Sequence, residues 1–152
     1  MLAPSGLALL GLEQMGAIGP LASVAAMLGR VVLLRGRGDE ADELTRTCER
    51  IAAPDQLDAQ VKWRSIRAIA LARRRDSEEA ERLAREAVYQ VDKTDQLDSL
   101  AEARVDLAEV LRLGGRHGEA GRELDRAILL YKQKGNVVAE ASARRLLAQV
   151  RR

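Results

Sequence analysis

Apolar residues recur with the period of an α-helix along most of this chain. The stretch 77–91 is the clearest example, because its apolar and small side chains fall three or four positions apart and so share one helix face. Those residues are Ala80, Leu83, Ala84, Ala87, Val88 and Val91. The same period predicts further helices over 5–15, 21–35, 39–52, 59–73, 99–113, 117–133 and 137–151. No alternating apolar and polar run of useful length indicates a strand, so the predicted fold class is all-α.

Turn and cap signals separate these segments. Glycine follows several of the apolar-periodic runs, as expected where a helix ends in a left-handed backbone conformation. These glycines are Gly36, Gly38, Gly114, Gly115 and Gly135. Ser99 and Glu102 have the spacing of a capping box, so Ser99 is predicted to cap the start of a helix.

The chain also repeats itself at an interval of 39 or 40 residues. The tetrapeptide Asp-Gln-Leu-Asp at 55–58 recurs at 95–98, and each copy precedes a helical pattern. A second motif, in which alanine follows an acidic residue, opens the second helix of each unit at Ala41, Ala80 and Ala120. An interval of this length indicates an array of helix hairpins. The predicted repeats are 21–56, 59–96 and 99–134, followed by a terminal helix at 137–151.

Small residues stand at matching positions of these units. Each opening alanine is followed seven residues later by another small side chain, at Cys48, Ala87 and Ala127. Small side chains allow a short distance between packed helices, so the alanines of this set are predicted to be buried where paired helices touch. They are Ala41, Ala80, Ala84, Ala87, Ala120 and Ala127.

This arrangement resembles the tetratricopeptide repeat, whose first helix carries a Leu-Gly pair and whose second helix carries Ala, a large residue and Ala. The match covers residues 21–133. The period of 39–40 residues is longer than the family's, which is about 34, and most of the family's aromatic positions are missing. The resemblance implies a single domain, 1–152, folded as a right-handed α-solenoid of about three antiparallel helix hairpins plus a terminal helix.

Several segments resemble one group of such proteins more closely. They are APDQLDAQVKWRSIRAIALARR, SEEAERLAREAV, LAEVLRLGGRHGEA and YKQKGNVVAEASARRLLA. They are similar to the C-terminal tetratricopeptide tail of bacterial multidomain regulators that join a nucleotide-cyclase-like domain to an AAA-type ATPase. The catalytic parts of those regulators are absent from this sequence. The resemblance therefore implies a regulatory or sensor segment of a signalling protein, without enzymatic activity.

The composition agrees with a helical array and indicates the cellular compartment in which the protein is expected. Hydrophobic residues make up 47% and charged residues 32% of the chain, a mixture that suits amphipathic helices. The single cysteine, Cys48, excludes an intramolecular disulfide and favours a reducing compartment, so the cytoplasm is expected. Residues 1–29 carry one charge, but they lack a basic start and are interrupted at Gly16, Gly19 and Pro20. Neither a signal peptide nor a membrane span is expected.

Few residues offer candidate chemistry, and each has a structural explanation. Residues 36–41 resemble a dinucleotide-binding loop, but such a loop follows a strand, whereas this one follows a predicted helix. The three aspartates within 92–98 lack the spacing of a calcium loop and are interpreted as turn and cap residues. His117, the single histidine, is interpreted as a turn residue and Cys48 as a buried structural thiol. No catalytic residue, cofactor or metal is therefore predicted.

Arginine runs and aromatic residues bear on the choice between protein and RNA as partner. The runs 73–75, 144–145 and 151–152 could contact nucleic acid, but acidic neighbours and the lack of stacking aromatics favour solvated helix faces. The three aromatic residues, Trp63, Tyr89 and Tyr131, are predicted to fill the core or its rim. The predicted function is a non-catalytic protein- or peptide-binding scaffold, and an RNA-binding helical repeat is the alternative.

The tetratricopeptide resemblance also implies where a partner binds, because in that family the first helix of each pair lines the inner curve. The family's inward positions correspond here to three rows of residues. The rows are Arg30, Ile69, Glu109 and Gln149; Ala26, Ser65, Val105 and Arg145; and Ser23, Lys62, Glu102 and Ser142, with Arg73 and Arg112 near the rim. Basic members such as Lys62 and Arg73 are expected to bind carboxylates, while Ile69 and Val105 form an apolar floor. An acidic-hydrophobic peptide is thus the expected partner.

The N-terminal segment offers a second surface. Residues 5–15 resemble the end of a second helix whose first helix is missing, so apolar surface is left over. The side chains expected to pack on the array or on another subunit are Leu7, Leu9, Leu10, Leu12, Met15 and Ile18. A homodimer through this segment, or a truncated parent protein, is expected, and this end is the alternative partner-binding surface.

Overall fold

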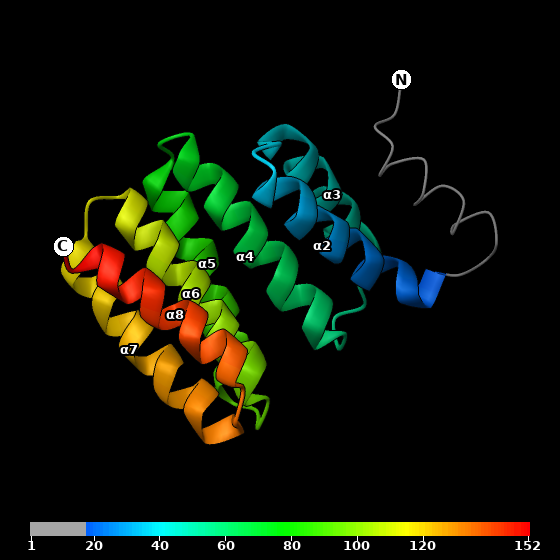
Figure 1. Ribbon diagram of the computed structural model, residues 1–152. Helices are drawn as coiled ribbons and strands as arrows, with labels where there is room; N and C mark the ends of the chain where they lie inside the picture. The colour runs from blue at the N-terminus through cyan, green and yellow to red at the C-terminus, as the bar shows by residue number, and fades with distance from the viewer. Residues whose placement is uncertain (1–17) are drawn as a thin grey trace.

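Every regular element in the described part of the chain is an α-helix (Figure 1). The computed structural model describes residues 18–152. Its helices are α2 (Ile18–Leu34), α3 (Gly38–Ile51), α4 (Leu57–Arg73), α5 (Ser77–Asp92), α6 (Leu97–Leu113), α7 (His117–Lys134) and α8 (Val137–Val150). The all-α prediction is confirmed, and each helix expected between residues 21 and 151 is found with its ends shifted by three residues at most. The helix predicted over 5–15 and its apolar surface lie outside the described residues.

Helices that follow one another along the chain pack side by side as antiparallel pairs. α2 packs with α3, α4 with α5, and α6 with α7, each across a short turn. α4 also contacts both α2 and α6, so these three first helices form one layer, while α8 packs on α7. The layer of first helices is the part of the fold that positions the candidate site.

The turns inside the three pairs share one backbone conformation. Gly36, Arg75 and Gly115 have φ of 75°, 69° and 80°. In each turn this residue and the next donate their N–H groups to carbonyls of the last turn of the preceding helix, at 2.9 to 3.1 Å. Such a left-handed helix end satisfies carbonyls that the helix itself leaves unpaired. Arg75 is the one non-glycine residue with positive φ between residues 18 and 152.

Some helix ends differ from the sequence prediction. Gly38 begins α3 and Gly114 has φ of −82°, so neither is a left-handed helix end. The capping box at Ser99 is wrong, because α6 begins at Leu97 and Ser99 lies inside it. His117, interpreted as a turn residue, is the first residue of α7, where the helix predicted over 117–133 was expected to begin.

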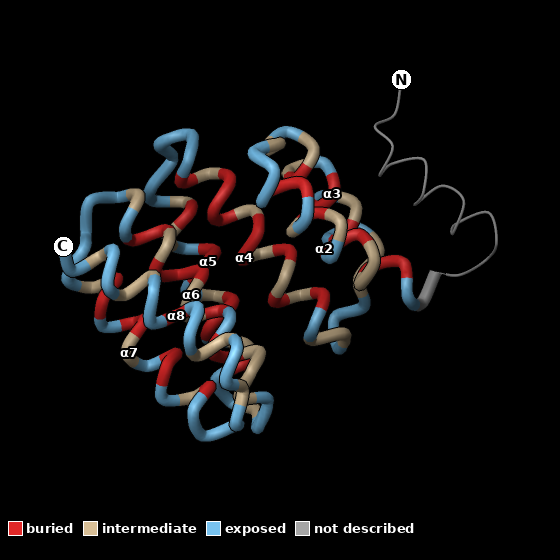
Figure 2. Tube along the Cα trace, in the orientation of Figure 1, coloured by how far each residue is buried: buried red, intermediate tan, exposed pale blue. Residues whose placement is uncertain are grey.

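The predicted alanine core is confirmed. All six alanines expected where paired helices touch are buried, with at most 1% of their surface exposed: Ala41, Ala80, Ala84, Ala87, Ala120 and Ala127. Cys48 is likewise fully buried. Figure 2 shows the buried positions along the helix sides that face one another. Leu33, Ile66 and Leu107 are among the largest side chains that are fully buried in the core.

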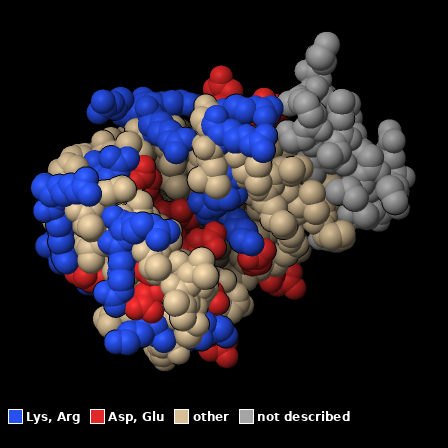
Figure 3. All heavy atoms as spheres, in the orientation of Figure 1, with Lys and Arg blue, Asp and Glu red and all other residues tan. Residues whose placement is uncertain are grey.

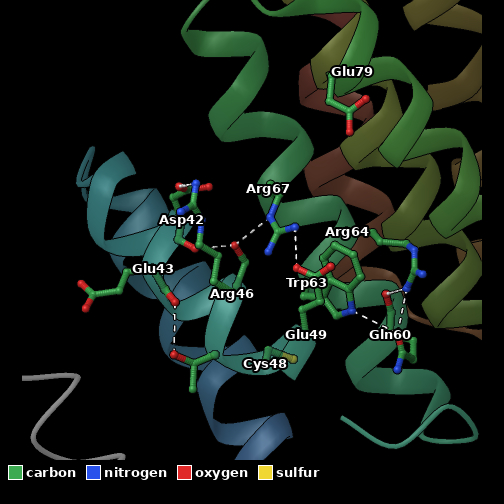
Figure 4. A network of polar contacts seen from close by, with 12 residues as sticks. Asp42, Glu43, Arg46, Cys48, Glu49, Gln60, Trp63, Arg64, Arg67 and Glu79 are labelled. Atoms are coloured by element: carbon green, nitrogen blue, oxygen red, sulfur yellow. Dashed lines mark hydrogen bonds and ion pairs between the residues drawn. The ribbon is translucent and has the colours of Figure 1, made fainter. Parts of the chain in front are cut away.

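Trp63 is buried in a polar network between α3 and α4 (Figure 4). Its Nε1 donates to Gln60 Oε1 at 3.1 Å. The guanidinium groups of Arg64 and Arg67 lie 4.3 and 4.5 Å from the centre of the indole ring. Arg67 also pairs with Glu49 of α3 at 2.8 Å. Trp63 is therefore a core residue, as predicted, and the network joins the first helix pair to the second.

Candidate partner-binding groove

One arginine connects the first and third helix pairs. Arg30 extends from α2 to α6, where Nη1 and Nη2 donate to the two carboxylate oxygens of Asp106 at 2.8 and 2.7 Å. Nη2 also donates to Glu102 Oε1 at 3.1 Å. These contacts, here called the Arg30 bridge, join residues more than 70 positions apart in the sequence. The inner sides of α2 and α6 are thus held together across α4.

Burial explains why the Arg30 bridge forms. Asp106 is 5% exposed, and a carboxylate with so little access to water needs a positive partner because desolvation penalises its charge. Burial also opposes the charge of Arg30. The attraction of Asp106 and the hydrogen bonds to it outweigh that effect, so the pKa of Arg30 lies above its ordinary value. The bidentate geometry fixes the guanidinium plane as well as its position.

Glu102 is the exposed member of this group, with 48% of its side chain accessible. Partial burial raises its pKa, the repulsion from Asp106 raises it further, and Arg30 works in the opposite direction. Lys62 pairs with Asp58, one helical turn away on α4, at 3.0 Å. Two basic and three acidic side chains therefore meet here, a net charge of −1. The inner face at this point attracts positive groups rather than negative ones.

The pocket among these charges is small. Leu57, Val61 and Ser65 of α4 line it together with the charged residues. Its volume of about 20 Å³ has room for about one water molecule. The Ser65 hydroxyl is buried and has no hydrogen-bond partner within the described part of the chain. A pocket of this size does not take a small organic ligand, so a partner would contact its rim.

An apolar hollow opens beside this pocket. It is lined by Ala26, Met27, Arg30, Val31, Lys62 and Glu102. Met27 is 60% and Val31 45% exposed, which is high for large apolar side chains. Figure 3 views the side that carries α2, α4 and α8, and it shows basic and acidic side chains meeting near the middle of that side. Exposed apolar surface bordered by charges is typical of an interaction site.

A second pocket lies between α6 and α8. Its lining includes Val105, Glu109 and Arg112 of α6 and Leu146 and Gln149 of α8. Arg112 donates to both carboxylate oxygens of its neighbour Glu109, at 2.9 and 2.7 Å. This hydrogen bonding raises the pKa of Arg112. We call the two pockets and the apolar hollow together the inner groove.

Eight of the fourteen residues that the resemblance places on the inner curve and its rim line one of the two pockets. Arg30, Lys62, Ser65 and Glu102 line the first pocket, and Val105, Glu109, Arg112 and Gln149 line the second. Ile69 is 5% exposed, so it belongs to the core and offers no apolar floor. Arg73 lies at the end of α4, where Nη1 donates to the carbonyl of Leu33 at 3.0 Å. Arg145 is exposed on α8 and lines neither pocket.

Asp106 and the apolar pair Met27 and Val31 were missed by the sequence prediction. Asp106 had a signal, because it stands among Ala103, Leu107 and other buried positions of α6. A charge on an apolar stripe is unusual and indicates a buried partner. No feature of the sequence near Asp106 indicates that this partner is Arg30.

Other chemistry is limited in the described residues. No group of three or more histidine, cysteine, aspartate or glutamate side chains between residues 18 and 152 could hold a metal ion. Burial of Cys48 raises the pKa of its thiol to about 11, so the reactive thiolate is scarce at neutral pH. No helix in the part of the chain that the structure covers is long and apolar enough to cross a membrane.

Comparison with known proteins adds no family. No protein-family model matches the chain, and no curated protein matches it. The tetratricopeptide repeat therefore stays a resemblance, and a function has to be inferred from the inner groove.

Proposed function

We propose that this chain is a right-handed, tetratricopeptide-like helical array that acts as a non-catalytic binding scaffold. The observation that supports it most directly is the inner groove, where three first helices and α8 contribute side chains to the two pockets and the apolar hollow. Helix hairpins stacked in this way offer an extended surface for a peptide or protein segment. The groove combines a bordered apolar hollow with fixed charges, which gives affinity and orientation.

The charges of the groove select the chemistry of the partner. Arg30 and Lys62 already pair with carboxylates of the same chain, so a partner's carboxylate would have to displace these contacts. Glu102 keeps half of its side chain exposed beside Met27 and Val31. A segment that places an apolar side chain in the hollow and a lysine or arginine on Glu102 fits this end of the groove. This chemistry replaces the acidic-hydrophobic peptide that the sequence led us to expect there.

A peptide selection tests this proposal. The full chain would be immobilised and screened against a displayed library of random peptides, and the selected peptides would be measured by fluorescence anisotropy. We expect selected peptides to be rich in basic and apolar residues. Val31→Glu should weaken their binding at least tenfold, because it removes the apolar contact that the hollow offers to the peptide's apolar side chain and fills the hollow with a hydrated group.

Glu43→Lys and Glu102→Lys form a matched pair for the charge. Glu43 is exposed on α3, and its carboxylate has no hydrogen bond or ion pair in residues 18–152. Its reversal should therefore leave binding unchanged, whereas reversal of Glu102 should weaken it. Circular dichroism would first show that each variant keeps its helices. Equal binding by wild type, Val31→Glu and Glu102→Lys would exclude the inner groove.

RNA binding is the competing function, and the aromatic residues argue against it. Single-stranded nucleic acid is commonly bound by stacking bases on exposed aromatic rings. Trp63 and Tyr131 are buried, and Tyr89 is the one exposed aromatic residue. Binding to mixed RNA that falls steeply with salt would favour this alternative, and no binding at low salt would remove it.

The wider setting follows from the resemblance. We propose that the chain serves as a regulatory or sensor segment of a larger bacterial signalling protein in the cytoplasm, and that it forms a homodimer through its apolar N-terminal segment. Met27, Val31 and Leu34 add exposed apolar surface on α2, the helix that follows that segment in the sequence. Sedimentation velocity over a range of concentrations tests the dimer, and a monomer at the highest concentration would exclude it.

A further inference from the structure

α8 has one face against the rest of the molecule and an opposite face without a neighbour in the described chain. Ala139, Leu146, Leu147 and Val150 pack inward, yet Ala143 is the only residue of α8 that is fully buried. On the opposite side, four exposed residues recur three or four positions apart and so share one helix face. They are Val138, Ala141, Arg145 and Ala148, here called the α8 outer stripe.

Two of these positions, those of Ala141 and Ala148, are buried in the preceding first helices. The repeat interval of 40 residues relates α8 to α6, and α6 to α4. The counterparts of Ala141 and Ala148 are Ala101 and Ala108 in α6 and Val61 and Ala68 in α4, none more than 6% exposed. Ala101 belongs to one apolar cluster with residues of α7 and α8. The α8 outer stripe therefore has the small side chains of a helix contact, but no helix between residues 18 and 152 covers it.

The surroundings of the α8 outer stripe are basic. α8 and the two residues after it, 137–152, contain four arginines and one acidic residue, Glu140, a net charge of +3, while the whole chain has +2. Arg145 has no ion pair in the described part of the chain, whereas Arg144 pairs with Glu140 at 2.8 Å. Basic side chains gather over α7 and α8, at the left of Figure 3. Positive charge around an uncovered apolar stripe favours an acidic partner.

We propose that the α8 outer stripe is a docking surface for an amphipathic helix of a partner protein, with aspartate or glutamate flanking its apolar residues. The partner helix would lie along α8 as α8 lies along its own neighbours. Ala141 and Ala148 allow close approach of the two helices, Val138 adds apolar contact, and Arg145 binds a carboxylate. This surface is separate from the inner groove and takes a partner of the opposite charge.

A designed peptide serves as the probe. It is a fluorescent synthetic helix of three heptads with leucine and alanine on its apolar face and glutamate at the flanking positions, and a second peptide has lysine in place of every glutamate. The full chain should bind the glutamate peptide at least tenfold more tightly than the lysine peptide. Arg145→Glu and Ala148→Gln should each weaken binding at least tenfold, the first by charge and the second by preventing close approach.

Two control variants distinguish docking on α8 from general charge attraction and from binding in the inner groove. Arg35→Glu makes the same charge change at an exposed arginine next to α2, and Val31→Glu blocks the apolar hollow; neither should change binding of the glutamate peptide. Equal losses for Arg35→Glu and Arg145→Glu would show non-specific charge attraction and overturn the proposal. Unchanged binding of the glutamate peptide by Ala148→Gln would also overturn the proposal. Loss with Val31→Glu alone would assign the peptide to the inner groove, which overturns this inference but not the proposed scaffold.

The sedimentation experiment identifies the other occupant of the stripe. Self-association that Ala148→Gln abolishes in the absence of peptide would show that a second copy of the chain covers α8, and it would overturn the proposal of an acidic partner helix. If Ala148→Gln leaves the oligomeric state unchanged, the result agrees with the proposal of an acidic partner helix.

Discussion

Arg75 occupies a backbone conformation that suits glycine. Its φ of 69° brings its Cβ too close to the backbone, a strain of about 1–2 kcal/mol for residues other than glycine. Glycine stands at the matching turn positions 36 and 115. The turn between α4 and α5 is thus the strained one of the three.

Replacing Arg75 with glycine should therefore stabilise the protein. We expect Arg75→Gly to raise the free energy of unfolding by about 0.5–1 kcal/mol, because the relief of strain exceeds the entropy that glycine adds to the unfolded chain. Urea denaturation measures this change. Arg74→Gly, at a neighbouring residue with φ of −88°, is the control and should give no gain.

Ala87 tests the packing of the second pair. It is fully buried in α5, so Ala87→Leu should lower the free energy of unfolding by about 1–3 kcal/mol through overpacking. Ala141→Leu makes the same change at an exposed position of α8 and should stay within about 0.5 kcal/mol of wild type. A melting midpoint unchanged by Ala87→Leu would contradict the contact seen here.

Glu102 should make stability depend on pH. Burial and the repulsion from Asp106 raise its pKa in the folded state, so the folded protein holds this proton more tightly than the unfolded chain. The contribution of Glu102 to stability therefore falls as pH rises from the ordinary carboxyl pKa, about 4.3, through the higher folded value. Glu102→Gln should gain stability relative to wild type between pH 4 and pH 7, as urea denaturation at both pH values would show. Glu43→Gln, measured in the same way, is the control. If the free energy of unfolding of Glu102→Gln differed from that of wild type by the same amount at pH 4 and at pH 7, the prediction would be contradicted.

At the scale of the helices, the sequence was informative because each helix carries its own apolar period. The stripe of α5 is readable from residues 77–91 alone, and the observed helix ends there differ by one residue at most. Helix starts were less readable. α3 to α7 begin without a side-chain cap, and among the helices with an observed cap residue only α8 has one, where Asn136 accepts the N–H of Ala139 at 3.1 Å. The capping-box pattern at Ser99 was therefore misleading.

The candidate site was only partly predictable for a physical reason. Eight residues at the family's inward positions line pockets of the inner groove, since a repeat interval carries a position from one helix to the next. Whether a charge at such a position is free depends on what reaches it from elsewhere. Arg30 and Asp106 are 76 residues apart in the sequence. A local sequence pattern therefore cannot predict that they pair. For this reason Arg30 was expected to be available to a partner, although it is already paired.

A double-mutant cycle measures how strongly the Arg30 bridge couples α2 to α6. Arg30→Met and Asp106→Leu should each lower the free energy of unfolding by about 2–4 kcal/mol, because each leaves a poorly solvated charge without its partner. The double variant should lose less than the sum of the two, by about 1.5 kcal/mol or more. The more exposed pair Lys62 and Asp58 is the control, with a coupling below about 1 kcal/mol. Additive losses for Arg30 and Asp106 would contradict the coupling.

At the scale of the whole molecule, the Arg30 bridge changes what is expected of a helical array. In arrays of repeats each unit usually contacts only its neighbours, so the ends can unfold before the middle. Here the first helix pair is held to the third as well as to the second. The described part of the chain should therefore unfold as one cooperative unit rather than from its N-terminal end. The bridge also fixes the width of the inner groove before a partner arrives.

The thiol of Cys48 can report chemically on separation of the first helix pair from the second. Its sulfur lies between α3 and α4, 3.6 Å from the carbonyl oxygen of Ala59, and it is the only thiol in the chain. A disulfide reagent at pH 8 can modify it only in molecules whose first helix pair has separated from the second, since the folded thiol is covered and rarely ionised. The modification rate should rise at least tenfold in Arg30→Met, whereas Arg35→Glu should modify as slowly as wild type. The rate of thiol modification, followed with a colorimetric assay, thus gives the frequency with which the first helix pair separates from the second under native conditions.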